Sequence, residues 1–192
     1  MRRGRARRSP RPWCRPERHR RRARGRGSIS GRGIAGSGVA NSTQGTLSKI
    51  DTNLLTERGR YVTRPDAAGN PSRTSVSLTG DVVVADPNGG VTKIHALAER
   101  CAESNGTPGI QSATDAKFLA WGEEECVAWY TPMAYFSQRP VAWTQGEFDA
   151  ATCSFSGQKV WMAGMNTPGT VDILRLDGDS GAIEATVPAT DA

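Results

Sequence analysis

The chain has 192 residues and a formal net charge of +6, from 25 Lys and Arg residues against 19 Asp and Glu residues. A length of this order fits one domain with a tail. The sequence shows no transmembrane segment, because no stretch is both long and apolar enough to cross a bilayer as a helix.

The basic charge is concentrated in residues 1–33. This segment contains 14 arginines and one acidic residue, Glu17, so it carries about +13 and the rest of the chain about −7. Without an aliphatic run it cannot offset the entropy of ordering, so we expect a disordered tail. A composition with no pattern beyond charge favours a tail that is not native coding sequence. Nucleic-acid binding through phosphate attraction is the disfavoured alternative, and no signal peptide is visible, since an apolar core is missing.

Three stretches of the remaining chain, 34–192, share one plan of strand, turn and strand. They are 39–51, 82–95 and 160–187, and they align at Ala40, Ala85 and Ala163. The returning strands also agree, at Lys49-Ile50-Asp51, Lys93-Ile94-His95 and Arg175-Leu176-Asp177. Repetition of this kind predicts an array of similar β units.

The second repeat contains the clearest hairpin. Residues 82–85 form a short apolar strand, residues 91–94 alternate as its partner, and Asn88-Gly89 in the turn accepts positive φ. We expect these two strands to be neighbours in a four-stranded antiparallel sheet, followed by one helical turn at 97–101.

About fifty residues, 101–153, separate the second and third repeats, and we expect an insertion that bears a disulfide. The candidates are Cys101, Cys126 and Cys153. A bond between Cys101 and Cys126 would contribute about 3 kcal/mol on the loop-closure model, and Cys126 with Cys153 is the alternative pairing. Disulfides indicate a compartment outside the cytoplasm. No Cys-x-x-Cys pair is present, so we predict no metal site and no cofactor.

The separation of Ala40 and Ala85 is typical of one blade of a four-stranded propeller repeat. In these and further residues the chain resembles the bacterial extracytoplasmic β-propeller proteins with NHL, YVTN and streptogramin-lyase-like repeats. The resemblance is carried by 39–42 with 45–51, 121–126, 139–143, 170–171, 175–177 and 180–181. It implies an all-β fold, and a secreted or lipid-anchored protein.

The length after the tail supplies only three to four blades, whereas propellers close with about four to eight. We therefore expect a partial β-propeller with an insertion, either as a fragment or with its ring completed by another chain. The predicted function is a non-catalytic binding or scaffold module, for an unidentified protein or carbohydrate.

The enzymatic alternative is a streptogramin-lyase-like lyase or hydrolase centred on His95, for which the resemblance implies a catalytic histidine. His95 stands where the other repeats have Asp51 and Asp177, so we interpret it as a turn residue. We expect no carboxylate or metal within about 4 Å of its ring nitrogens.

Other motifs are assigned structural roles. Gly178-Asp179-Ser180-Gly181 matches the nucleophile motif of chymotrypsin-like proteases, but the setting of His95 does not fit that family, so we predict a turn. Glu123–Glu125 is predicted as a solvated acidic turn. The tryptophans of this half of the chain are weak candidates for carbohydrate stacking, with packing in a blade core favoured: Trp121, Trp129, Trp143 and Trp161.

Overall fold

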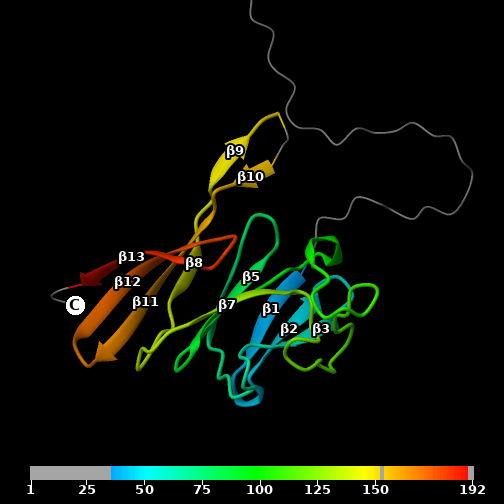
Figure 1. Cartoon of the computed structure of the whole chain (residues 1–192), viewed down its shortest axis with the longest axis horizontal. Helices are drawn as coiled ribbons and strands as arrows, with labels where there is room; N and C mark the ends of the chain where they lie inside the picture. Colours follow the sequence, from blue (N-terminus) through cyan, green and yellow to red (C-terminus); the bar gives the residue numbers. More distant parts are fainter. Residues whose placement is uncertain (1–35, 152–153, 190–192) are drawn as a thin grey trace, which may run out of the picture.

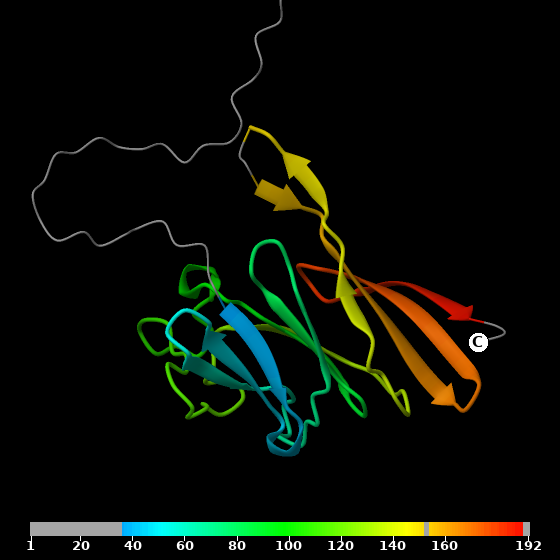
Figure 2. The same ribbon diagram turned by 180° about the vertical axis from the view of Figure 1, so that it is seen from behind.

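The computed structural model describes residues 36–151 and 154–189 (Figures 1 and 2). The expectations about the basic tail and about Cys153 lie outside the described residues. The described part is all-β, with two 3-10 turns, Ser42–Gln44 and Ala98–Arg100. Within this part, no helix is long and apolar enough to cross a membrane.

The strands form four antiparallel sheets, three of which make up the body of the molecule. Sheet A contains β1 (Gly36–Asn41), β2 (Thr46–Asp51) and β3 (Thr56–Val62). Sheet B contains β4 (Arg73–Val76), β5 (Val82–Asp86), β6 (Gly90–Ile94) and β7 (Val127–Pro132). Sheet C contains β8 (Val141–Trp143), β11 (Lys159–Thr167), β12 (Thr170–Asp177) and β13 (Ile183–Ala189). The fourth is a hairpin of β9 (Glu147–Asp149) and β10 (Ser154–Ser156), which projects away from sheet C in both views.

The three sheets stack in chain order, with sheet B between the other two (Figure 1). One core lies between sheets A and B and contains Leu47, Tyr61, Val84, Ile94 and Cys126. A second core lies between sheets B and C and contains Val83, Val91, Val160, Met162, Leu174 and Leu176. The edge strand β4 of sheet B contacts the edge strands of both neighbours, β1 and β8. The same edge of each sheet therefore gathers at one side of the stack.

The sequence repeat corresponds to one sheet per copy. The pairs Ala40↔Leu47, Ala85↔Val91 and Ala163↔Ile173 lie directly opposite each other in sheets A, B and C. Each of the three stretches therefore forms a hairpin in the same register, at the edge of sheet A for β1–β2 and in the middle of sheets B and C for β5–β6 and β11–β12. Because side chains alternate between the two faces of a strand, equal register also places equivalent residues on equivalent faces.

The hairpin predicted in the second repeat is confirmed, since β5 and β6 are paired antiparallel along their length. Its turn differs in conformation from the expectation, because neither Asn88 nor Gly89 has a positive φ. The amide of Gly89 donates to the carbonyl of Asp86, at 3.2 Å. Pro87 occupies the second position of this turn and holds φ negative, so the turn with positive φ at both central residues cannot form.

The stretch 101–153, expected as an insertion, is divided among three sheets, because it also supplies β9 of the projecting hairpin. It supplies β7 as the outer strand of sheet B and β8 as the edge strand of sheet C. The part without strands is the loop between Cys101 and Cys126, and these two cysteines form the disulfide. The prediction of a disulfide is thus confirmed, and of the two expected pairings the structure contains Cys101 with Cys126.

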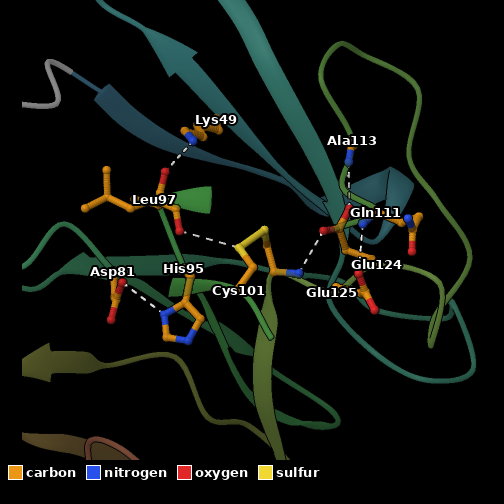
Figure 3. The surroundings of a disulfide bond; sticks show 11 residues. Lys49, Asp81, His95, Leu97, Cys101, Gln111, Ala113, Glu124 and Glu125 are labelled. Carbon is orange, nitrogen blue, oxygen red and sulfur yellow. Dashed lines mark hydrogen bonds and ion pairs between the residues drawn. A yellow bond between two sulfur atoms is a disulfide. The ribbon is translucent and has the colours of Figure 1, made fainter. Parts of the chain in front are cut away.

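Two buried carboxylates hold this loop, and Figure 3 shows them beside the disulfide. The expectation of a solvated acidic turn is wrong for Glu124 and Glu125, which are 5% and 3% exposed. Glu125 accepts hydrogen bonds from the backbone amides of Ser104, at 2.6 Å, and Gln111, at 2.8 Å. These bonds hold the pKa of Glu125 below its ordinary value. A loop without strands has few backbone partners of its own, and the carboxylates replace them.

Removing the disulfide should destabilise the fold. We expect the double variant Cys101→Ser/Cys126→Ser to lose about 3 kcal/mol of unfolding free energy, because the unfolded chain regains the freedom of the closed loop. Urea unfolding followed by tryptophan fluorescence measures this loss. Ala102→Ser, an exposed neighbour, is the control and should unfold like the wild type. Equal midpoints for the double variant and the control would contradict the prediction.

Candidate functional site

The strongest cluster of charged side chains surrounds Asp81, directly before β5. Its carboxylate is 2% exposed and faces two cationic side chains and an imidazole. The distances to its oxygens are 2.8 Å from Nη1 of Arg100, 3.2 Å from Nδ1 of His95 and 3.5 Å from Nζ of Lys93. Figure 3 shows the His95 contact. The expectation that no carboxylate lies near His95 is therefore wrong, because it considered equivalent turns of other repeats and not the opposite strand of the same hairpin.

The three basic side chains around Asp81 keep it ionised. Burial alone would raise the pKa of this carboxyl, but the hydrogen bond with His95 and the charges of His95, Arg100 and Lys93 outweigh it. The net effect holds the pKa of Asp81 below its ordinary value. The stabilisation that depends on this charge is thus present at neutral pH and is lost as the pH falls through the pKa of the carboxyl.

Lys93 connects this cluster to sheet C. Its side chain is 3% exposed, and its Nζ donates to the carbonyl of Gly178, at 2.7 Å, in the turn after β12. The same ammonium lies 5.5 Å from the ring centre of Trp143, a cation–π arrangement. Asp179 lies 3.8 Å away and is largely exposed. Lys93 therefore joins two sheets through a buried charge.

The Asp81–His95 pair has a counterpart in sheet C. Asp81 and His95 flank the last pair of their hairpin, Val82↔Ile94. The equivalent position in sheet C holds Lys159↔Asp177, with Nζ and carboxylate 2.7 Å apart. One cross-strand position thus carries an acidic side chain and a basic partner in both sheets, with the acidic residue on opposite strands of the hairpin. This equivalence indicates that the pair closes the end of the hairpin.

The chemistry available to His95 depends on its surroundings. An imidazole held at Nδ1 by a buried carboxylate can accept a proton at Nε2, as in hydrolytic triads. The serine of the Gly178–Gly181 motif does not complete such a triad, because the Ser180 hydroxyl donates to Asp177, at 2.9 Å. This serine stands in the turn between β12 and β13, as predicted.

The cavity beside His95 is small. It lies between sheets A and B and has a volume of about 50 Å³. Its lining is mostly apolar and includes Leu47, Tyr61 and Ile94, with Lys49 at the border. Substrate pockets have volumes of about 300–1,000 Å³. The cavity is thus too small for a substrate of ordinary size.

The candidate tryptophans do not share one surface. Trp129 and Trp143 pack against the core between sheets B and C, and the indole of Trp129 donates to Gly178, at 3.3 Å. Trp121 lies edge-on to Tyr130 with ring centres 5.7 Å apart. Trp161 is 40% exposed on the outer side of sheet C. A shared carbohydrate platform is therefore not formed by these rings, and core packing accounts for two of them.

Asp86 is a buried carboxylate that the sequence analysis did not single out. The only local signal in the sequence is its position directly before a turn that contains proline. It is fully buried at the end of β5, and one oxygen accepts a hydrogen bond from the Thr63 hydroxyl, at 3.1 Å. Among residues 36–151 and 154–189, its Oδ2 has no hydrogen-bond partner. Burial raises the pKa of Asp86 to about 6.

Over the same described ranges, no group of three or more His, Cys, Asp or Glu side chains is placed to hold a metal ion. No family model matches this chain, and no curated protein matches its sequence. The function is therefore argued from the geometry of the repeats and of the Asp81 cluster.

Replacing Asp81 tests the structural importance of the cluster. Asp81→Asn leaves Lys93 and its neighbours without their buried counter-charge, so we expect a loss of about 3–5 kcal/mol in unfolding free energy. Asp179→Asn is the matched control, because this carboxylate is exposed beside the same lysine, and it should cost less than about 1 kcal/mol. Urea unfolding of both variants at pH 7 measures the difference. Similar losses would show that the buried carboxylate has no special role.

The raised pKa of Asp86 predicts that its contribution to stability changes with pH in the opposite direction to that of Asp81. Its folded-state pKa lies above the unfolded value, so the folded protein loses stability as the pH rises from about 4 to above 6. Asp86→Asn should remove this loss, which amounts to at most about 3 kcal/mol. Urea midpoints of wild type and variant at both ends of that range provide the test. Parallel pH profiles for the two proteins would refute the assignment.

Proposed function

We propose that this chain is a non-catalytic binding or scaffold module, built from β-propeller-type repeats and acting outside the cytoplasm on a protein or carbohydrate partner. The propeller architecture is supported by the stacking of sheets A, B and C in chain order. It is further supported by the gathering of β1, β4 and β8 at one side of the stack. Such stacks provide rigid frames on which loops carry the binding function.

One observation carries the non-catalytic part of the proposal. The Asp81–His95 pair and the Lys159–Asp177 pair occupy the same cross-strand position of two repeats. A catalytic pair has no reason to recur with the acidic residue on the opposite strand, whereas a pair that closes a hairpin tolerates either arrangement. The contacts of Asp81 with Arg100 and Lys93, in addition to His95, and the small cavity beside His95 also support a structural role.

The location outside the cytoplasm is supported by the disulfide between Cys101 and Cys126. Thiols of cytoplasmic proteins are normally kept reduced, so a structural disulfide favours an oxidising compartment. The bond closes a loop that has no strands of its own, where it constrains the chain most.

A lyase or hydrolase centred on His95 remains the second candidate, because the hydrogen bond of Nδ1 to a buried carboxylate is an arrangement that general bases use. Nucleic-acid binding through residues 1–33 lies outside the described residues. Deleting that segment and measuring retention on immobilised DNA would test it separately.

His95→Ala distinguishes the two main candidates. We expect the wild type and this variant to show the same background rates on nitrophenyl esters, nitrophenyl glycosides and a lactone-containing cyclic peptide. Retention on a panel of immobilised polysaccharides should also agree within about twofold, because the proposal gives His95 no contact with a ligand. Circular dichroism establishes that the variant is folded. Turnover by the wild type that His95→Ala abolishes and Asp179→Asn retains would identify an enzyme instead.

A further inference from the structure

Sheet C has one face that no described strand covers, the face turned away from sheet B. We call it the outer face of sheet C. It is apolar, and an open hollow of about 800 Å³ extends over much of it. Trp161, Ile173 and Val187 are 40%, 39% and 55% exposed there. The face is made of Ala142, Trp161, Ala163, Met165, Val171, Ile173, Arg175 and Val187. Apolar patches of this kind mark contact surfaces.

The repeat register shows what kind of surface this is. Ile173 on the outer face is equivalent to Leu47 in sheet A and Val91 in sheet B, since each lies opposite the aligned alanine of its repeat. Leu47 and Val91 are 1% and 0% exposed, because the next sheet covers them. The outer face of sheet C is thus the third copy of a face that receives another sheet in the first two.

A cation on each of these faces supports the equivalence. Lys49 donates through Nζ to the carbonyl of Ala96, in the segment that follows β6 of the next sheet. Lys93 donates to the carbonyl of Gly178, at 2.7 Å, in the turn that follows β12. Ala96 and Gly178 both stand two residues after the last apolar residue of the returning strand. In both interfaces, therefore, the same repeat position donates to the same backbone position across the contact.

The third cation is Arg175 of the outer face. It lies opposite Trp161 in the ladder, and its guanidinium is 6.0 Å from the ring centre of that tryptophan. Its Nε is 3.0 Å from a carboxylate oxygen of Glu184. The guanidinium is thus positioned to reach a carbonyl in the turn of a further sheet, as the two lysines do.

The complementary surface is the face of sheet A turned away from sheet B, here called the outer face of sheet A. Val39 and Ile50 take the positions on it that Val84 and Ile94 take on the receiving face of sheet B. Val39 is 46% exposed and Ile50 is half-buried. By the same register, the carbonyl that would meet Arg175 belongs to Thr52, next to the carboxylate of Asp51.

We propose that a second copy of this chain packs the outer face of its sheet A on the outer face of sheet C, and that the reciprocal contact closes a dimer. The outer faces of sheets A and C lie on opposite sides of sheet B, so the described residues of one chain do not bring them together, and the proposed contact forms between two copies. Each new contact continues the face-to-face packing that joins sheets A, B and C. A head-to-tail contact that closes after two copies forms a ring of limited size. The inference depends on the stacking of the sheets and not on the proposed binding role.

The test uses one exposed substitution on each face of the full chain. Ile173→Lys places a charge on the outer face of sheet C, and Val39→Lys does so on the outer face of sheet A. Sedimentation velocity gives the molar mass at protein concentrations up to about 100 μM. We expect the wild type to sediment with twice the chain mass of 20.5 kDa, and each variant with one chain mass. Phe118→Lys, an equally apolar and 51% exposed position in the loop before Cys126, is the control and should remain dimeric.

Mixing the two variants gives the decisive result. The Ile173→Lys copy keeps an intact sheet A face and the Val39→Lys copy keeps an intact sheet C face, so an equimolar mixture should recover a dimer with one interface. A monomeric wild type or a monomeric mixture overturns the proposal. Loss of the dimer with Ile173→Lys but not with Val39→Lys also overturns it, because sheet C would then pack on its own copy. Thermal melting verifies folding, and Val187→Lys, 55% exposed on the same face, replaces Ile173→Lys if that variant unfolds.

Discussion

Burial of both faces of sheet B is the constraint on which the rest of the structure depends. Val83 and Val84 are neighbours on β5 and point to opposite faces, yet both are 0% exposed. A sheet with two apolar faces is stable only between two partners. Sheets A and C are those partners, so each must present one apolar face to sheet B. The order of the three sheets follows the order of the three hairpins along the chain, because each hairpin belongs to one sheet.

Charged groups connect the sheets where apolar packing ends. Lys93 is buried between sheets B and C, and it is tolerated there because Asp81 supplies a counter-charge and Gly178 an acceptor. Lys49 makes the equivalent contact between sheets A and B. Beside it, the disulfide and the buried Glu124 and Glu125 hold a loop that has no strands (Figure 3). The disulfide-bonded loop is thus held by buried carboxylates as well as by its covalent bond.

The contact with Asp81 explains why His95 resembles a catalytic base although we propose a structural role for it. A histidine bonded through Nδ1 to a buried aspartate has the geometry of a general base. The same strand position in sheet C carries Lys159 and Asp177, which stabilise a hairpin end and have no such geometry. The equivalent position in sheet C therefore supports the structural role that we propose for His95. The apolar outer face of sheet C is a better candidate for contact with a partner than the small cavity beside the histidine.

The sequence by itself determined the all-β class, the three repeats, the β5–β6 hairpin and the candidate cysteines, because alternation, turn residues and internal repetition are local signals. It also assigned Ser180 to a turn. Only the tertiary structure decided that Cys101 pairs with Cys126, that residues 101–153 supply strands to three sheets, and that Glu124, Glu125 and Asp86 are buried. It alone revealed Asp81 beside His95, and a face of sheet C left uncovered. These features depend on which strands and sheets become neighbours. The alternation of residues in the sequence predicts which face of a strand a side chain lies on, but not which other part of the chain packs against that face.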